Sequence, residues 1–288
     1  CFFGILIVAG IEYGCNIQEK NIRRIEICIA GCIITIFMMY SIDISYQGTI
    51  LLNELLLLYV FWACQNAYVK PVEYCHLRKV SLKSIGLIIV AAIFLFIMAD
   101  YVNACSMIAF QNLLDDSLRA IVNKPVEALV VVAILPAIIE EFLFRGMIYR
   151  GIANKSNKKI AIIISALLFA FLHMNFNQMC YAFVMGLVFA IVIYLTDNLS
   201  VSILLHMLFN AFTVIITCFE KSNAIQAILQ CNIAGYTLFN PSLTDTQGKI
   251  EISLLIIGGL IAILSAVIAG WLILLIAKTE KTTETTIN

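Results

Sequence analysis

Charged residues are scarce in this chain of 288 residues. Asp, Glu, Lys and Arg make up 12% of it, whereas a soluble domain carries about 25%, and hydrophobic residues make up 62%. Basic and acidic side chains number 18 each, so no large basic surface for nucleic acid is expected. Several apolar runs reach or approach the ~20 residues that cross a bilayer. The sequence therefore predicts an all-α integral membrane protein that has the lipid bilayer as a partner.

Closely paired cysteines are also missing. The chain has ten cysteines but no CxxC, and the nearest pair, Cys28 and Cys32, lies within an apolar run. Small buried thiols are expected here rather than a disulfide framework or a zinc knuckle. The chain opens on Cys1, inside an apolar run and without a methionine. We therefore expect its native N-terminus to be absent.

Long apolar stretches, by contrast, recur along the whole chain. They fall at 1–13, 26–40, 50–68, 84–102, 125–149, 160–174, 179–196, 200–218 and 252–277. Their length and composition predict a polytopic bundle of about eight to nine transmembrane helices. We divide the chain into N-terminal transmembrane helices over 1–124, core helices over 125–218, and a loop, a last transmembrane helix and a polar tail over 219–288.

Lys and Arg divide between alternate loops. Basic side chains gather in 70–83 and 150–159 and after the last apolar stretch, whereas 41–49 and 174–178 contain neither Lys nor Arg. By the positive-inside rule, the basic loops and the C-terminus are predicted to be cytoplasmic. The Ile-rich composition and the lack of organelle signals favour a multi-pass protein of a bacterial cell membrane.

Ionisable side chains inside a membrane segment are costly and by default mark a function. Those that we single out are Glu140, Glu141, Arg145, His173 and His206. Glu141 and Arg145 stand four residues apart on one helix face, so they can form an ion pair. Glu140 is rotated by roughly 100° from Glu141. We therefore predict that Glu141 pairs with Arg145 and that Glu140 is left to meet the histidines.

Histidine is rare, with three in the chain, yet two of them fall in these segments. A carboxylate and an imidazole around a water are the parts of a general-base hydrolysis, so Glu140 with His173 could activate water. His206 and Asn210 share a helix face at a spacing of four. They could donate hydrogen bonds to the oxyanion that forms when water attacks a carbonyl.

A bound metal is the alternative. Glu140, His173 and His206 would make a zinc triad with an open position for water. The chain has no HExxH motif, however, and Asn210 would be an unusual zinc ligand. The cofactor is left unknown with zinc as the candidate, and direct Glu/His catalysis is slightly favoured. No other cofactor-binding residue is predicted.

Three motifs follow one another along the predicted core. They are Glu140-Glu141-x-x-x-Arg145, Phe169-x-x-x-His173 and His206-x-x-x-Asn210. Over about 125–218 the sequence resembles the CPBP family, also called Abi, of CAAX proteases and bacteriocin-processing membrane proteins. The resemblance implies an intramembrane endopeptidase, in a family whose members are named metalloproteases, with Glu140, His173, His206 and Asn210 as the catalytic set. It also implies a membrane-associated peptide or protein as substrate, of the CAAX type or a bacteriocin or pheromone precursor.

Two other interpretations stay open. The protein could be a non-catalytic bacteriocin self-immunity or scaffold protein that uses the same fold. It could also be a transporter or channel whose buried charges line a pathway, although no internal repeat supports this. The oligomeric state is left open.

Overall fold

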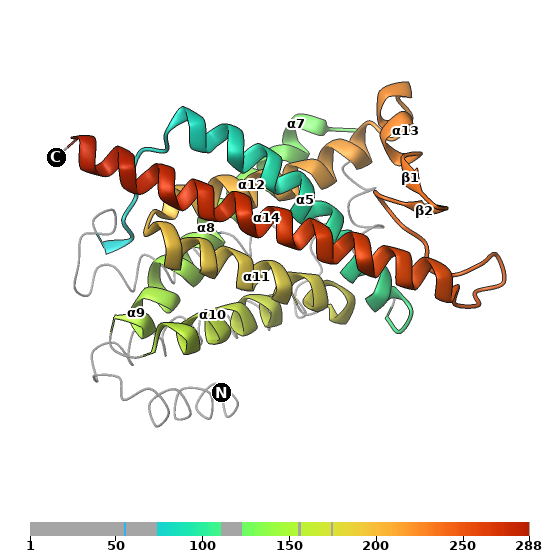
Figure 1. Cartoon of the computed structure of the whole chain (residues 1–288), viewed down its shortest axis with the longest axis horizontal. Helices are drawn as coiled ribbons and strands as arrows, with labels where there is room; N and C mark the ends of the chain where they lie inside the picture. The colour runs from blue at the N-terminus through green and yellow to red at the C-terminus, as the bar shows by residue number, and fades with distance from the viewer. Residues whose placement is uncertain (1–54, 56–73, 111–122, 155–156, 174, 288) are drawn as a thin grey trace.

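The computed structural model describes Leu55 and residues 74–110, 123–154, 157–173 and 175–287, which form a mostly helical bundle (Figure 1). Every apolar stretch predicted from residue 84 onward is helical where it is described. The predicted stretches 1–13, 26–40 and 50–68 lie outside the described residues, apart from Leu55. The predicted count of eight to nine transmembrane helices therefore stays a prediction.

Four helices in the described part of the chain are long and apolar enough to cross a membrane. They are α5 (Leu82–Met107), α11 (Phe176–Thr196), α12 (Leu199–Cys218) and, in α14 (Ile252–Ile287), the stretch Ile252–Thr282. At a rise of about 1.5 Å per residue, a helix of this kind spans the ~30 Å hydrocarbon layer. The predicted all-α membrane protein is confirmed at this level.

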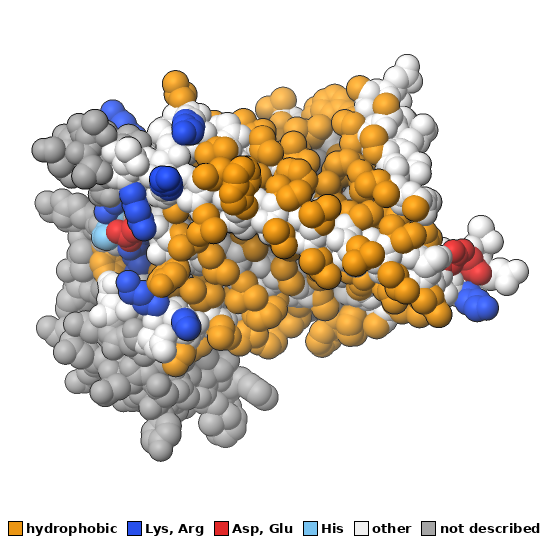
Figure 2. Space-filling view, viewed as in Figure 1, with side chains coloured by type: hydrophobic (Ala, Val, Ile, Leu, Met, Phe, Trp, Pro, Cys, Tyr) orange, Lys and Arg blue, Asp and Glu red, His pale blue; other side chains and the backbone are white. Residues whose placement is uncertain are grey.

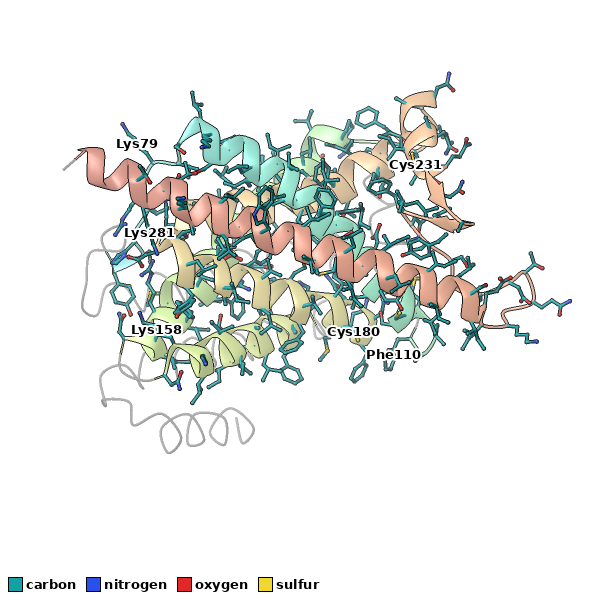
Figure 3. All side chains as sticks on the ribbon, in the orientation of Figure 1. Lys79, Phe110, Lys158, Cys180, Cys231 and Lys281 are labelled. Carbon is teal, nitrogen blue, oxygen red and sulfur yellow. The ribbon has the colours of Figure 1, made fainter. Side chains whose placement is uncertain are left out.

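The distribution of side chains fits a membrane protein. Figure 2 shows a broad apolar belt around the middle of the molecule, with Lys and Arg gathered at the end where the C-terminus lies and a smaller charged group at the opposite end. Figure 3 labels Lys79, Lys158 and Lys281 at the first end. Charged side chains at both ends with apolar side chains between them are the distribution expected of a protein that spans a bilayer.

Asparagine and serine start the long helices. Ser81 caps α5 and Asn157 caps α10 (Lys158–Leu172), while Asn175 and Asn198 cap α11 and α12. In each case the side-chain oxygen accepts a backbone N–H of the first turn, which has no partner within the helix. These caps lie between apolar stretches, so local sequence places the helix starts.

The stretch from Pro125 to Ala153 is one continuous helix in five pieces. These are α7 (Pro125–Ala128), the π-helix η1 (Leu129–Ile134), α8 (Leu135–Glu141), the π-helix η2 (Phe142–Tyr149) and α9 (Arg150–Ala153). The two π-helical pieces flank α8, which ends with Glu140 and Glu141. Such segments are rare and are frequent at functional sites.

The second half of this composite helix, from Leu143 to Ile152, is buried in the bundle. Pieces η1 and α8 pack against α12, and η2 packs against α10 and α11. Helices α5 and α14 lie side by side and cover α11, and α5 also packs on α12 (Figure 1). The carboxylates at the end of α8 are therefore enclosed by three other helices.

The region 219–251 was predicted as a loop, and the structure corrects this. It contains α13 (Asn223–Leu229) and a hairpin of β1 (Asn232–Ile233) and β2 (Tyr236–Thr237). Two residues with positive φ, Ala234 and Gly235, make its turn, which suits the right-handed twist of paired strands. Helix α14 continues through the predicted polar tail to Ile287.

Asp197 is the centre of a polar network at the end that carries the C-terminus. It ends α11 in the left-handed conformation, with φ of 51°. Its carboxylate accepts from Arg150 at 2.7 Å, from His76 at 2.6 Å and from Arg78 at 3.3 Å. The turn between α11 and α12 is thereby tied to α9 and to the segment before α5.

The same network holds the end of α14. Asn198 donates to the carboxylate of Glu280 at 3.1 Å, and the backbone N–H of Ser81 donates to the other oxygen of Glu280 at 3.2 Å. Glu280 is buried. The last helix is therefore fastened to the starts of both α5 and α12.

Candidate active site

Glu141 and Arg145 form a fully buried ion pair. The Nη1 atom of Arg145 lies 2.8 Å from Oε1 of Glu141, and neither side chain is exposed. The Nη2 atom donates to the backbone carbonyl of Gly186 at 3.0 Å, and the guanidinium lies 4.3 Å from the centre of the Phe169 ring. The pair predicted from the spacing of four residues is therefore confirmed, and α11 and α10 help to hold it.

Glu141 has two further partners on α12. The hydroxyl of Ser202 donates to Oε2 at 2.7 Å, and Nδ1 of His206 lies 3.0 Å from Oε1. An ionised carboxylate can only accept, so Nδ1 of His206 carries the proton. Glu141 therefore pairs with Arg145 as predicted, and it also binds His206, a contact that was not predicted.

Glu140 lies on the other side of the same imidazole. Its Oε2 atom is 4.0 Å from Nε2 of His206, and the residue is 7% exposed. The rotation between neighbouring helix positions turns Glu140 and Glu141 toward opposite edges of the ring. His206 thus stands between the two carboxylates.

His173 is connected to this site by the ring of Phe169, which contacts both imidazoles. It follows the last residue of α10, and its Nδ1 lies 2.9 Å from the carbonyl oxygen of Phe169. A carbonyl oxygen accepts, so Nδ1 is the donor and Nε2 remains as an acceptor. The Phe169 ring contacts both imidazoles edge-on, with centroids 5.0 Å from His173 and 5.7 Å from His206. The two histidines are therefore brought to one aromatic side chain.

Asn210 is oriented by a backbone carbonyl of η1. Its Nδ2 atom donates to the carbonyl oxygen of Val132 at 3.1 Å. The amide is thus anchored one turn beyond His206, with its second N–H available for another acceptor.

Three neighbours of the site are not visible in the motifs. They are Ser202, Gly186 and Phe189, whose ring stacks on His206 with centroids 4.6 Å apart and planes at 22°. Only Ser202 has a sequence signal, because it stands four residues before His206 and eight before Asn210 on one helix face. A Cβ at position 186 would lie 3.1 Å from the backbone of Ala166, so the glycine allows α10 and α11 to approach closely.

The residues proposed as a zinc triad do not fit a metal site in this arrangement. Among the described residues, no three His, Cys, Asp or Glu side chains are grouped closely enough to hold a metal ion. We therefore derive no step through a metal.

The comparisons with known proteins agree with the motifs. Residues 122–212 match the family model described as type II CAAX prenyl endopeptidase Rce1-like. The chain is 34% identical over 116 residues to the membrane-embedded CAAX protease MroQ of Staphylococcus aureus, which covers 38% of this chain and 47% of that protein. It is 31% identical over 87 residues to the putative membrane peptidase YdiL of Bacillus subtilis, which covers 30% and 36%.

These matches centre on the core helices. The matched part spans less than half the length of either relative, and no solved structure matches the chain. The matched family segment contains all seven residues named in the three motifs, from Glu140 to Asn210. The predicted resemblance is confirmed over residues 122–212, which match the model of the CAAX prenyl endopeptidase family.

Proposed function

We propose that this protein is an intramembrane endopeptidase that hydrolyses a peptide bond in a membrane-associated peptide or protein. The observation that carries the proposal is the position of His206 between two buried glutamates. Glu141 binds its Nδ1 at 3.0 Å, and Glu140 faces its Nε2 at 4.0 Å. The kinship with CAAX proteases supports the same activity.

The charges of the site suit acid–base chemistry. With Glu140, Glu141 and Arg145 all ionised, the group carries one net negative charge, which is costly to bury. One further proton, shared between Glu140 and Nε2 of His206, makes it neutral. The site then contains a carboxylate that can take a proton and an N–H that can donate one, as hydrolysis requires.

In the first step Glu140 acts as the general base. A water within about 2.8 Å of its Oε2 gives up a proton to Glu140 while its oxygen bonds to the carbon of the peptide carbonyl. The carbonyl oxygen becomes an oxyanion, and Nε2–H of His206 donates to it. Glu141 balances the charge on the imidazolium, because it stays bound to Nδ1.

In the second step the proton on Glu140 passes to the leaving nitrogen. The C–N bond breaks, the carbonyl re-forms, and the products are a carboxylic acid and an amine. His173 has its Nε2 free to accept from the attacking water, as a second acceptor beside Glu140. Asn210 has a second N–H to offer the oxyanion, because the first is bound to Val132.

The surroundings of the site support a proposal for the substrate and for the location. A carboxylate enclosed by apolar helices suits a peptide that reaches it from within or along the membrane, such as a CAAX-type substrate or a bacteriocin or pheromone precursor. We assign the protein to a bacterial cell membrane. The basic end in Figure 2, which carries the C-terminus, then faces the cytoplasm.

Glu140→Gln tests this function. The purified protein, in liposomes with a fluorogenic membrane-anchored peptide, should lose at least about a hundredfold in cleavage rate, because the general base is gone. Its thermal unfolding temperature should stay close to that of the wild type, since the amide keeps the volume of the carboxylate. Cleavage at the wild-type rate would contradict the proposal.

Two further measurements separate the alternatives. A chelator should leave the cleavage rate unchanged; a loss that added zinc restores would favour the metal-dependent mechanism. A non-catalytic immunity or scaffold protein would keep its protective effect on the host in the Glu140→Gln variant. An intramembrane protease whose protection depends on cleavage would lose it.

A further inference from the structure

Ser202 is a fully buried serine that the three motifs do not include. It stands one helical turn before His206 on α12, and its hydroxyl donates to Oε2 of Glu141 at 2.7 Å. A second acceptor, the carbonyl of Phe189, lies farther away at 3.4 Å. The carboxylate is therefore the closer partner of this hydroxyl.

The two oxygens of Glu141 have different partners. Oε1 accepts from both Arg145 at 2.8 Å and His206 at 3.0 Å, whereas Oε2 accepts from Ser202. A carboxylate held at one oxygen can swing about that contact, while a carboxylate held at both has its plane set. The orientation of the His206 ring depends on that plane, because Nδ1 binds Oε1.

We infer that Ser202 is a positioning residue that fixes the carboxylate of Glu141 and, through it, the imidazole of His206. The inference rests on the proposed function, because it concerns the geometry of that reaction. Small displacements of a reacting group reduce the rate strongly, about a hundredfold for 1 Å. In this role Ser202 acts through Glu141, the carboxylate that its hydroxyl binds.

Ser165 provides a matched control. It is also a fully buried serine, and its hydroxyl donates at 3.1 Å to the backbone carbonyl of Phe144 rather than to a carboxylate. Replacing either serine by alanine removes one hydroxyl from the helix bundle. Only the change at Ser202 should alter the imidazole of His206.

The kinetic test compares Ser202→Ala with Ser165→Ala. Ser202→Ala should lower kcat for peptide cleavage about tenfold or more with little change in KM, because a hydrogen bond to a charged group is lost where the transition state needs it. Ser165→Ala should keep the wild-type kcat. Ser202→Thr, which retains the hydroxyl, should recover most of the kcat, and it also serves if the alanine variant does not fold.

A spectroscopic readout works without activity. The chain has three histidines, so ¹⁵N-histidine NMR can follow the Nδ1–H proton that His206 shares with Glu141. That signal should shift in Ser202→Ala and stay in place in Ser165→Ala. An unchanged signal together with an unchanged kcat overturns the inference.

The outcomes also separate this inference from the proposed function. If Glu140→Gln abolishes cleavage while Ser202→Ala has no effect on kcat or on the His206 signal, the function stands and the inference fails. If the wild-type protein cleaves no peptide, the proposed function fails. The position of the His206 signal then still decides whether Ser202 orients Glu141.

Discussion

The Nδ1 atom of His206 and the Nη1 atom of Arg145 meet at a single oxygen, Oε1 of Glu141, at 3.0 and 2.8 Å. A cation and an imidazole N–H therefore converge on one carboxylate that has no exposed surface. Glu141 holds the site together, whereas Glu140, at the other edge of the ring, faces the position proposed for the reaction. The two adjacent glutamates should respond differently to the same substitution.

Glu141→Gln should lose stability as well as activity. The neutral amide removes the charge that pairs with Arg145 and leaves a buried cation without compensation, at a cost of roughly 3 kcal/mol. Thermal unfolding in detergent, measured beside Glu140→Gln, checks this. Equal unfolding temperatures for the two variants would contradict the different roles.

Arg145→Lys should destabilise the protein although the charge is kept. An ammonium lacks the planar fork that binds Glu141 and the Gly186 carbonyl while lying over Phe169. The loss of one hydrogen bond to a charged group should lower the free energy of unfolding by about 1.5–3 kcal/mol. This should be measured as a lower midpoint of thermal unfolding. A wild-type midpoint would mean that the Gly186 contact adds nothing.

Gly146→Ala should destabilise the protein, and Cys75→Ala should rescue it. A Cβ at position 146 would lie 2.7 Å from the sulfur of Cys75, and such overpacking costs about 1–3 kcal/mol. Removing the sulfur opens the required space. Gly151→Ala is the matched control, because its Cβ would approach nothing closer than the Tyr74 hydroxyl at 4.0 Å. A double variant as unstable as Gly146→Ala would show that the clash lies elsewhere.

Gly258→Ala should loosen the hairpin from α14. A Cβ there would overlap the Tyr236 ring and lie 2.8 Å from the Tyr101 ring. Hydrogen exchange of the hairpin amides should become faster, since Tyr236 is the buried side chain that docks it. Gly270→Ala, in the same helix with open space around it, should leave the exchange unchanged. Slow exchange in Gly258→Ala would argue against this docking.

Asp197→Asn should lower stability at neutral pH and not in acid. Partial burial raises the pKa of the Asp197 carboxyl, but Arg150 and His76 lower it by more, so it lies below its ordinary value. The charged carboxylate therefore stabilises the fold at pH values above about 3.9, the pKa of Asp in the unfolded chain. This stabilisation is lost as the pH falls through the pKa of Asp197 in the folded protein.

The effect should be modest, since the side chain is half exposed and solvent screens the pairs, which limits the contribution to about 1 kcal/mol. Asparagine tolerates the left-handed conformation of position 197, so the substitution isolates the charge. Thermal unfolding of both proteins at pH 7 and near pH 3 checks the prediction. A difference that does not shrink toward the lower pH would point to a cause other than the charge.

Local patterns were enough to predict the class of the protein and the position of each described long helix. An apolar stretch of sufficient length must be helical in a bilayer, because its backbone groups have no other partners. The Glu141–Arg145 pair could also be predicted, since both residues belong to one helix and a spacing of four brings them together. The order of the three motifs likewise indicated the family.

Contacts between helices could not be predicted from such local patterns. Glu141 is contacted by Ser202, His206 by Phe189 and Arg145 by Gly186, and in each pair the two residues belong to different helices. These contacts depend on how α11 and α12 are rotated about their axes. The apolar faces of these helices are broad, so the pattern of hydrophobic residues does not specify that rotation. For this reason the histidine assigned to Glu140 is bound by Glu141 as well.

Asn210 shows which part of the site could be predicted from the sequence and which part depended on the packing of the helices. Its spacing from His206 follows from the sequence. The hydrogen bond from the Asn210 amide to the carbonyl of Val132, however, depends on the packing of α12 against η1. Periodicity along one helix is set by backbone geometry, whereas the meeting of two helices is set by the packing of all their side chains together.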